Sequence, residues 1–170
     1  LWTARAIGYR EAHGISHDDV ALAVVVQTLV PADVSGVLFT ANPVTGVRRQ
    51  IVVDATVGLG EALVSGQVEP DHVVLAWQSG AVLESTVGAK AVATRPLPGG
   101  GVQTSARPDA DRREPALTDG QLRQLAAVAR AIDHEYGTAQ DVEWAFAGDD
   151  LWVLQSRAIT TLFDVPVALA

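Results

Sequence analysis

Apolar residues recur at helical spacing in two parts of this chain. The first part is residues 1–14, which end at Gly14, a residue type that readily adopts the left-handed conformation in which many helices end. The second part follows residues 118–121, where Thr118 and Gln121 form a capping-box pattern, and it ends at Gly137. We therefore predict a helix in each part. The apolar positions are Trp2, Ala6, Tyr9 and Ala12 in the first part and Leu122, Leu125, Ala129 and Ile132 in the second.

Between these helices the pattern is typical of β-strands. Runs of β-branched and apolar residues alternate with turn sequences rich in Pro, Asn, Asp and Gly. The turn at residues 58–60 is expected to lead into a short helix. Residues 96–117, rich in Gly, Pro and charge, are expected to form an exposed loop without continuous regular structure. We expect neighbouring strands of one sheet over residues 21–30, 34–41 and 50–57, a further strand over 72–77, and a strand pattern that continues over 81–95.

Two further alternating runs, 141–147 and 151–157, predict a β-hairpin around Gly148-Asp149-Asp150. A loop of these three residues places the four polar side chains of the hairpin in opposed pairs on one face, shared with Leu151 and Val153. A two-residue loop would set Glu143 against Leu154 and scatter the polar groups, which favours the longer loop. The expected pairs are Glu143 with Gln155 and Asp141 with Arg157. The predicted fold class is α/β (α+β), mostly one antiparallel sheet with flanking helices.

The polar face of this hairpin is a candidate metal and phosphate site. A carboxylate (Glu143) beside an amide oxygen (Gln155) suits Mg²⁺, which prefers oxygen ligands and usually takes only one or two from the protein. Arg157 offers a planar guanidinium for a phosphate. The alternative is an ordinary solvated face on which Asp141 and Arg157 form a cross-strand ion pair.

Composition excludes several other functions. The chain has 12 basic and 20 acidic residues and a net charge of −8, so it lacks the basic surface that binds nucleic acid. It has no cysteine, which excludes disulfides and thiolate zinc sites, and its 4 histidines show no metal-ligand spacing. No apolar run approaches the length of a membrane-spanning helix, so we expect no membrane contact and a cytoplasmic location.

Two weaker signals lie in the first half. Gly58-x-Gly60 follows a predicted strand, but Leu63 stands where a dinucleotide-binding fingerprint needs a small residue, and the chain has no Gly-Lys-Ser/Thr phosphate loop. Gln27 interrupts an apolar run, so if it is buried we expect a nucleotide or a backbone group beside it.

Taken in order, these motifs resemble the nucleotide-binding domain of the phosphoenolpyruvate synthase and pyruvate phosphate dikinase family, which has an ATP-grasp-type fold. Within the family, GLGEALVSG and the QSR-x-ITTL ending look most similar to the rifampin phosphotransferases, with phosphoenolpyruvate synthase second. The segments that carry the resemblance are LWTARAIGYREAHG at 1–14, AVVVQTLVPADVSGVLFTANPVTG at 23–46, GLGEALVSGQVEPD at 58–71, AQDVEWAF at 139–146 and LWVLQSRAITTL at 151–162.

The resemblance implies a site and a reaction. Residues around position 27 would contact the adenine base, partly through backbone groups, and the hairpin would hold Mg²⁺ through Glu143 and Gln155. The implied nucleotide-binding residues are Gln27, Thr28, Leu29, Glu143, Gln155 and Arg157. In the family, ATP phosphorylates a histidine on a separate domain through its β-phosphate, releasing AMP and phosphate, and the histidine then passes the phosphoryl group to pyruvate or to the antibiotic. The implied partners are ATP, Mg²⁺, and the phosphohistidine and acceptor domains of the same full-length protein.

Two departures from the family bear on this interpretation. Ala158 follows Arg157 where the family has proline, which would leave the arginine less firmly placed. The family's domain is also about twice this length, and the chain has no methionine, so we expect residues 1–162 to be its C-terminal half and 163–170 the start of a linker. Such a piece lacks half of the phosphate site and is expected to be inactive. The alternative is a noncatalytic nucleotide-binding or interaction module, a degenerate stand-alone family member.

Overall fold

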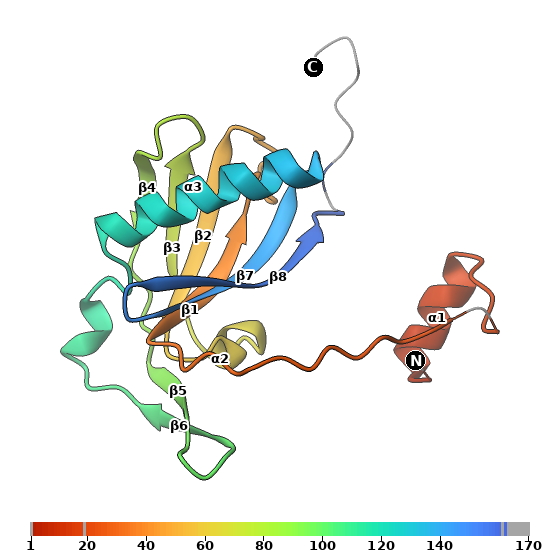
Figure 1. The fold of residues 1–170 in the computed structure, drawn as a ribbon, viewed down its shortest axis with the longest axis horizontal. Helices are drawn as coiled ribbons and strands as arrows, with labels where there is room; N and C mark the ends of the chain where they lie inside the picture. Colours follow the sequence, from red (N-terminus) through yellow and green to blue (C-terminus); the bar gives the residue numbers. More distant parts are fainter. Residues whose placement is uncertain (1, 19, 161, 163–170) are drawn as a thin grey trace.

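The computed structural model describes residues 2–18, 20–160 and 162, and its largest element is a six-stranded sheet in the order β4-β3-β2-β1-β7-β8 (Figure 1). Every neighbouring pair in this sheet is antiparallel, which confirms the predicted fold class. The linker predicted over 163–170 lies outside the described residues. The strands are β1 (Val34–Phe39), β2 (Gln50–Val57), β3 (Asp71–Ala76), β4 (Val82–Thr86), β7 (Gln140–Ala147) and β8 (Asp150–Ala158).

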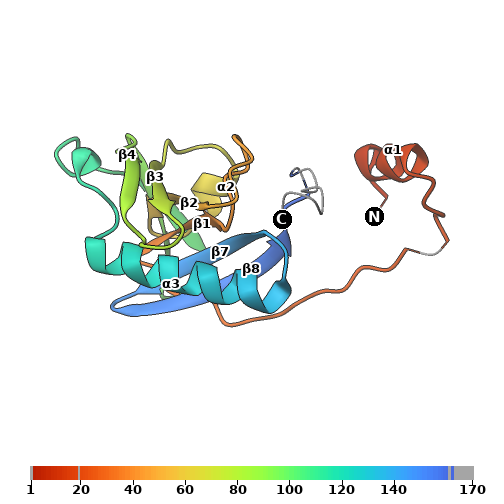
Figure 2. The same cartoon turned by 90° about the horizontal axis from the view of Figure 1, so that it is seen from above.

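Helix α3 (Asp119–Tyr136) packs across one face of this sheet (Figures 1 and 2). Its predicted capping box is present, because the Thr118 hydroxyl accepts from the Gln121 amide and the Gln121 side chain accepts from the Thr118 amide. Gly137 ends it with a φ of 65°. The main core lies between α3 and the sheet, with Leu125, Ala129 and Phe146 each 0% exposed. No helix in the described ranges is long and apolar enough to cross a membrane.

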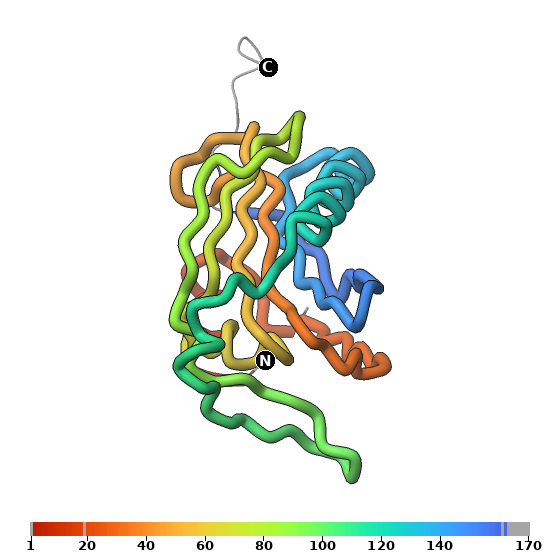
Figure 3. Tube along the Cα trace, turned by 90° about the vertical axis from the view of Figure 1, so that its left-hand side faces the viewer, coloured from red at the N-terminus to blue at the C-terminus, as the bar shows by residue number. Residues whose placement is uncertain are grey.

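A second sheet of two strands, β5 (Val92–Pro96) and β6 (Val102–Ala106), forms a hairpin beyond one end of the large sheet (Figure 3). It corrects two predictions. The strand pattern over 81–95 is interrupted at residues 87–91, and the segment 96–117 is exposed as expected but contains β6 and the short 3-10 helix Asp111–Arg113. The glycines that argued against regular structure instead make the hairpin turn, since the Leu97 amide donates to the Gly101 carbonyl at 3.0 Å.

Helix α1 (Ala4–Ala12) forms where it was predicted but lies apart from the sheet, joined to it by an extended segment (Figure 1). The short helix expected after the turn at residues 58–60 is α2 (Glu61–Val64). The strand predicted over residues 21–30 is wrong. The segment is extended, but within the described part of the chain no strand pairs with it, and a strand needs a hydrogen-bonded neighbour. Gln27 is therefore exposed and not buried.

Candidate functional site

The β7–β8 hairpin has the predicted pairs of opposed residues, but its loop is shorter than predicted and its register shifts within the hairpin. Ala147 pairs with Asp150, so the loop has two residues, Gly148 and Asp149, and not three. A β-bulge between Glu143 and Trp144 then shifts the register by one residue between the hairpin loop and the polar pairs. The opposed pairs are Glu143 with Gln155 and Asp141 with Arg157, as predicted.

The bulge also changes which face each residue of β8 occupies. Leu151 and Val153 pair with Phe146 and Trp144, whose side chains belong to the core under α3. Beyond the bulge, Gln155 lies opposite Glu143 and so on the other face. The prediction that the polar residues share a face with Leu151 and Val153 is therefore wrong, because an extra residue reverses the alternation.

The face turned away from α3 carries a row of five opposed residues, one from each of five neighbouring strands. In strand order the row is His72, Asp54, Val37, Glu143 and Gln155. His72 Nδ1 lies 2.7 Å from Asp54 Oδ1. No functional role was predicted for these two residues from the sequence. Strand alternation could have placed them on this face, but only with the sheet order known.

Glu143 and Gln155 are the two members of this row best suited to a metal. Glu143 is half-buried and Gln155 is exposed, and neither side chain has a hydrogen-bond or ion-pair partner among the described residues. A carboxylate and an amide oxygen held opposite each other fit Mg²⁺, which takes few protein ligands and fills the rest with phosphate oxygens and water. Within the described ranges no cluster of three or more His, Cys, Asp or Glu residues could hold a metal, so a site here would be of this sparse kind.

Asp141 and Arg157 are bound to each other. Arg157 donates from Nε at 2.8 Å and from Nη2 at 2.7 Å to Asp141 Oδ2. The ion pair considered as the alternative in the sequence analysis is thus present. The Arg157 side chain is nevertheless 68% exposed, so its Nη1 group remains available to solvent or to a phosphate.

A cleft lies beside this row, between residues 27–30, the turn at 59–60 and the β7–β8 hairpin. It consists of three adjoining cavities of about 510, 580 and 150 Å³, all lined by Leu29 and Leu154. Gln27 and Thr28 line the second and third, and Glu143 lines the first. The structure therefore brings the predicted 27–29 segment and Glu143 to one cleft, while Gln155 and Arg157 are not among its lining residues.

The Gly58-Leu59-Gly60 turn that closes the cleft is fixed by hydrogen bonds. Gly58 has a φ of 82°, its amide donates to the Asp33 carbonyl at 2.7 Å, and its carbonyl accepts from the Ser35 hydroxyl at 2.6 Å. The Leu59 amide donates to the Thr94 carbonyl of β5 at 2.8 Å. The sequence of this turn is a weak match to a dinucleotide-binding motif, whereas in the structure the turn forms an apolar wall, and Leu59 lines two of the cavities together with Leu29 and Leu154.

The sequence is similar to known proteins over nearly its whole length. The family described as pyruvate phosphate dikinase, AMP/ATP-binding domain, matches residues 1–166. A rifampicin phosphotransferase of Streptomyces sp is 48% identical over 166 residues, 98% of this chain and 19% of that protein. A probable phosphoenolpyruvate synthase of Methanothermobacter thermautotrophicus is 44% identical over 162 residues, 95% of this chain and 23% of that protein. The chain therefore spans about a fifth of the length of the curated relatives it matches.

Proposed function

Because this chain belongs to the pyruvate phosphate dikinase AMP/ATP-binding domain family, we propose that it is the Mg-ATP-binding part of a larger ATP-dependent phosphotransferase. In the proposed reaction, a histidine on a separate domain takes the phosphoryl group that originates as the β-phosphate of ATP, with AMP as the leaving group, and water takes the γ-phosphoryl group, which is released as phosphate. The histidine then passes the group to an acceptor. A rifampin-type antibiotic and pyruvate are the two acceptors proposed, since the relatives are named as rifampicin phosphotransferases and phosphoenolpyruvate synthases.

The observation that carries this proposal is the pair of unpartnered oxygen donors, Glu143 and Gln155, opposite each other on adjacent strands of the described chain. In the proposed complex they hold Mg²⁺, and the exposed guanidinium of Arg157 contacts a phosphate. Bound Mg²⁺ would neutralise phosphate charge during transfer, which is the main requirement of this chemistry. Leu29 and Leu154 offer apolar surface for the adenine ring, and Gln27 and Thr28 offer backbone groups to its edge.

The test is Glu143→Ala in the full-length protein. We expect ATP-dependent AMP release to fall by about 10²-fold or more, the scale seen when one charge-stabilising group is removed from an active site. The fold should be retained, because Glu143 is only half-buried and makes no protein hydrogen bond in the described ranges. Asp149→Ala, at the exposed turn of the same hairpin, is the matched control and should leave the rate unchanged. Unchanged turnover in the Glu143 variant would assign the metal site elsewhere.

The 170-residue chain by itself is proposed to be inactive. Its single lysine, Lys90, is 0% exposed and ion-paired to Asp71, so it cannot supply a free ammonium group to the ATP phosphates. Incubation of the purified chain with Mg-ATP, followed by chromatography of the nucleotides, should yield no AMP above the rate of a blank. Measurable ATP-dependent AMP release would show that the chain carries a complete phosphate site.

A further inference from the structure

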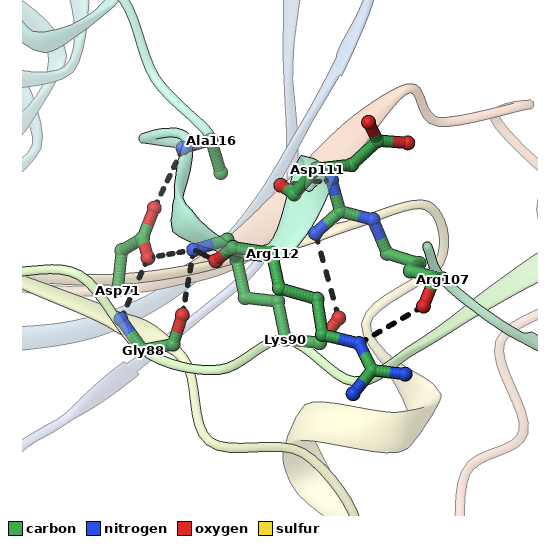
Figure 4. A network of polar contacts seen from close by, with 7 residues as sticks. All are labelled: Asp71, Gly88, Lys90, Arg107, Asp111, Arg112 and Ala116. Atoms are coloured by element: carbon green, nitrogen blue, oxygen red, sulfur yellow. Dashed lines mark hydrogen bonds and ion pairs between the residues drawn. The ribbon is translucent and has the colours of Figure 1, made fainter. Parts of the chain in front are cut away.

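The buried lysine belongs to a network that no step of the proposed reaction uses (Figure 4). Lys90 lies in the connection between β4 and β5, and its ammonium group donates to the Asp71 carboxylate, to the Gly88 carbonyl at 2.9 Å and to the Arg112 carbonyl at 3.3 Å. Its φ of 39° makes it the one non-glycine residue of the described part with a positive φ. A strained backbone persists only where the surroundings fix it.

Asp71 connects three segments that are far apart in the sequence. One carboxylate oxygen accepts from Lys90 and from the Gly88 amide at 2.9 Å, and the other accepts from the Ala116 amide at 2.6 Å. Asp71 is itself 4% exposed and begins β3. The carboxylate therefore ties β3 to the 87–91 connection and to the segment before α3 (Figure 4).

Stability alone does not account for such a pair. Two buried charges are costly to desolvate, and replacing a buried ion pair by apolar residues is often neutral or stabilising. Hydrogen bonds with defined directions do, however, fix positions more narrowly than apolar contacts. A positioning role is therefore the more informative explanation for the network.

The part that the network positions is the β5–β6 hairpin. Lys90 comes two residues before β5 begins, and the Arg107 amide, just after β6, donates to the Ala91 carbonyl at 2.9 Å. The Arg107 guanidinium also reaches the Lys90 carbonyl at 3.4 Å and the Asp111 carbonyl at 2.9 Å. Both strands of the hairpin are thus held at the end where the buried pair lies.

The hairpin in turn touches the nucleotide cleft at two places. Thr94 of β5 forms a bridge to Gly58 and accepts from the Leu59 amide at 2.8 Å, and it is 2% exposed. Val102 of β6 lines the same cavity as Glu143. A shift of the hairpin would therefore move the glycine turn and one wall of the cleft together.

We propose that the Asp71–Lys90 pair positions the β5–β6 hairpin so that Thr94 holds the Gly58–Gly60 turn in the shape that the cleft needs for Mg-ATP. The pair contacts no cleft residue directly within the described chain and acts through the hairpin. The identity of the ligand rests on the proposed function, whereas the coupling between the pair and the turn is a property of this chain and is tested without any ligand.

The first experiment measures amide hydrogen exchange by NMR in the 170-residue chain as wild type, Lys90→Met and Leu125→Ala. Met keeps the length of the lysine stem without its charge, and Leu125→Ala weakens the core under α3 away from the hairpin. In Lys90→Met the Leu59 amide should exchange about tenfold faster relative to the α3 amides, because the turn that contains it can then open while the core under α3 stays folded. In Leu125→Ala the exchange rates of the Leu59 amide and of the α3 amides should rise by the same factor. A Leu59 rate that changes in parallel with α3 in both variants overturns the proposal.

The second measurement needs no variant, so it applies even if Lys90→Met fails to fold. In the wild-type chain at increasing sub-denaturing urea, the Leu59, Gly88 and Ala116 amides should exchange as one unit with a common free energy and urea dependence. Separate opening of the Leu59 amide from the other two would contradict the coupling.

The third measurement is a calorimetric titration of the same proteins with Mg-ATP. Lys90→Met should raise Kd by about tenfold, because the Gly58–Gly60 turn would have to become ordered when Mg-ATP binds. Leu125→Ala should leave Kd unchanged at temperatures where the variant is folded. If the wild-type chain binds no Mg-ATP, nucleotide binding by this chain is contradicted, and the exchange data still decide the positioning role. If wild type binds and Lys90→Met binds equally well, the positioning role is overturned.

Discussion

Gly58 shows how a single residue shapes the cleft. Its φ of 82° is strained for any residue with a Cβ, and a Cβ at this position would also overlap the Thr94 carbonyl oxygen that accepts the Leu59 amide. Two separate physical requirements, a left-handed backbone and a close approach of another strand, therefore meet at one glycine. The energetic effects of the two requirements can be separated by comparison with a glycine that has the left-handed backbone but no close contact.

Gly101 is that comparison, because it has a φ of 78° and, in the described part of the chain, no atom lies within 4 Å of the position that a Cβ would occupy. Gly101→Ala should cost about 1 kcal/mol of unfolding free energy, the strain of the left-handed backbone alone. Gly58→Ala should cost at least about 2 kcal/mol, because the overlap with Thr94 adds to the same strain. Urea unfolding followed by tryptophan fluorescence, to which the buried Trp144 contributes, measures both losses. Equal losses in the two variants would mean that the Thr94 contact relaxes without cost.

Two carboxylates on one strand illustrate what residue-level prediction can achieve. Sequence alternation placed Asp141 and Glu143 on one face and opposite Arg157 and Gln155, and the structure agrees. The same reasoning could not decide which of the two carboxylates would form an ion pair within the protein, because that depends on side-chain geometry. Asp141 is bound to Arg157, while Glu143 has no hydrogen-bond or ion-pair partner in the described ranges, and its binding of a metal remains a prediction.

At the scale of elements, α3 was predictable in full because all of its signals are local. The capping residues, the apolar spacing and the terminal glycine lie within 118–137, and the structure has the helix at Asp119–Tyr136 between them. The strands predicted over 34–41 and 50–57 also rested on local signals, since each is a run of β-branched and apolar residues bounded by turn sequences, and they form as β1 and β2.

The elements that sequence did not predict depend on distant partners. Residues 21–30 have strand composition, but a strand exists only when another strand pairs with it, and composition carries no information about that. The Gly-rich segment within 96–117 became a hairpin turn because β5 was available to pair with β6. The bulge on β8 left no sequence signal either, and without it the hairpin loop was predicted one residue too long.

The candidate site was predicted in part. Family resemblance was confirmed by the match over residues 1–166, and the opposed Glu143–Gln155 pair is present. The roles of Gln27, Thr28 and Leu29 in nucleotide binding remain a prediction, supported by their position on the cleft. The Asp71–Lys90 network was not foreseen, since its members are separated by the whole of β4 and meet only in the folded chain.

At the scale of the whole molecule, the two faces of the large sheet differ in how they are completed. The face under α3 is a closed core, whereas the other carries the row with Glu143 and has the cleft beside it. The extended segment before β1 runs away from the sheet (Figure 2). That segment and α1 lie apart from the sheet and expose large apolar side chains, with Trp2 68% and Tyr9 60% exposed. Relatives of this chain are about five times as long, and in a protein of that length other parts of the chain can cover an exposed apolar surface of this kind.

Isolated from any longer chain, this molecule should therefore associate with itself through the extended segment. Val24, Val25 and Val26 are 79%, 80% and 93% exposed in succession, and their backbone has no strand partner in the described ranges. An extended, apolar, unpaired segment is a template for pairing with a second copy. The sedimentation coefficient of the wild-type chain should rise with concentration over roughly 10 to 300 μM, the range in which weak interfaces of this kind form.

Val25→Lys should suppress that rise, because a charge on an unpaired strand opposes pairing with another copy. Val44→Lys is the matched control: it makes the same change of charge at a residue that is 91% exposed but lies in the turn between β1 and β2, away from the segment. It should associate as the wild type does. Equal suppression by both variants would assign the effect to net charge, and a wild-type chain that stays monomeric throughout would show that the exposed valines alone provide too little apolar surface to hold two copies together.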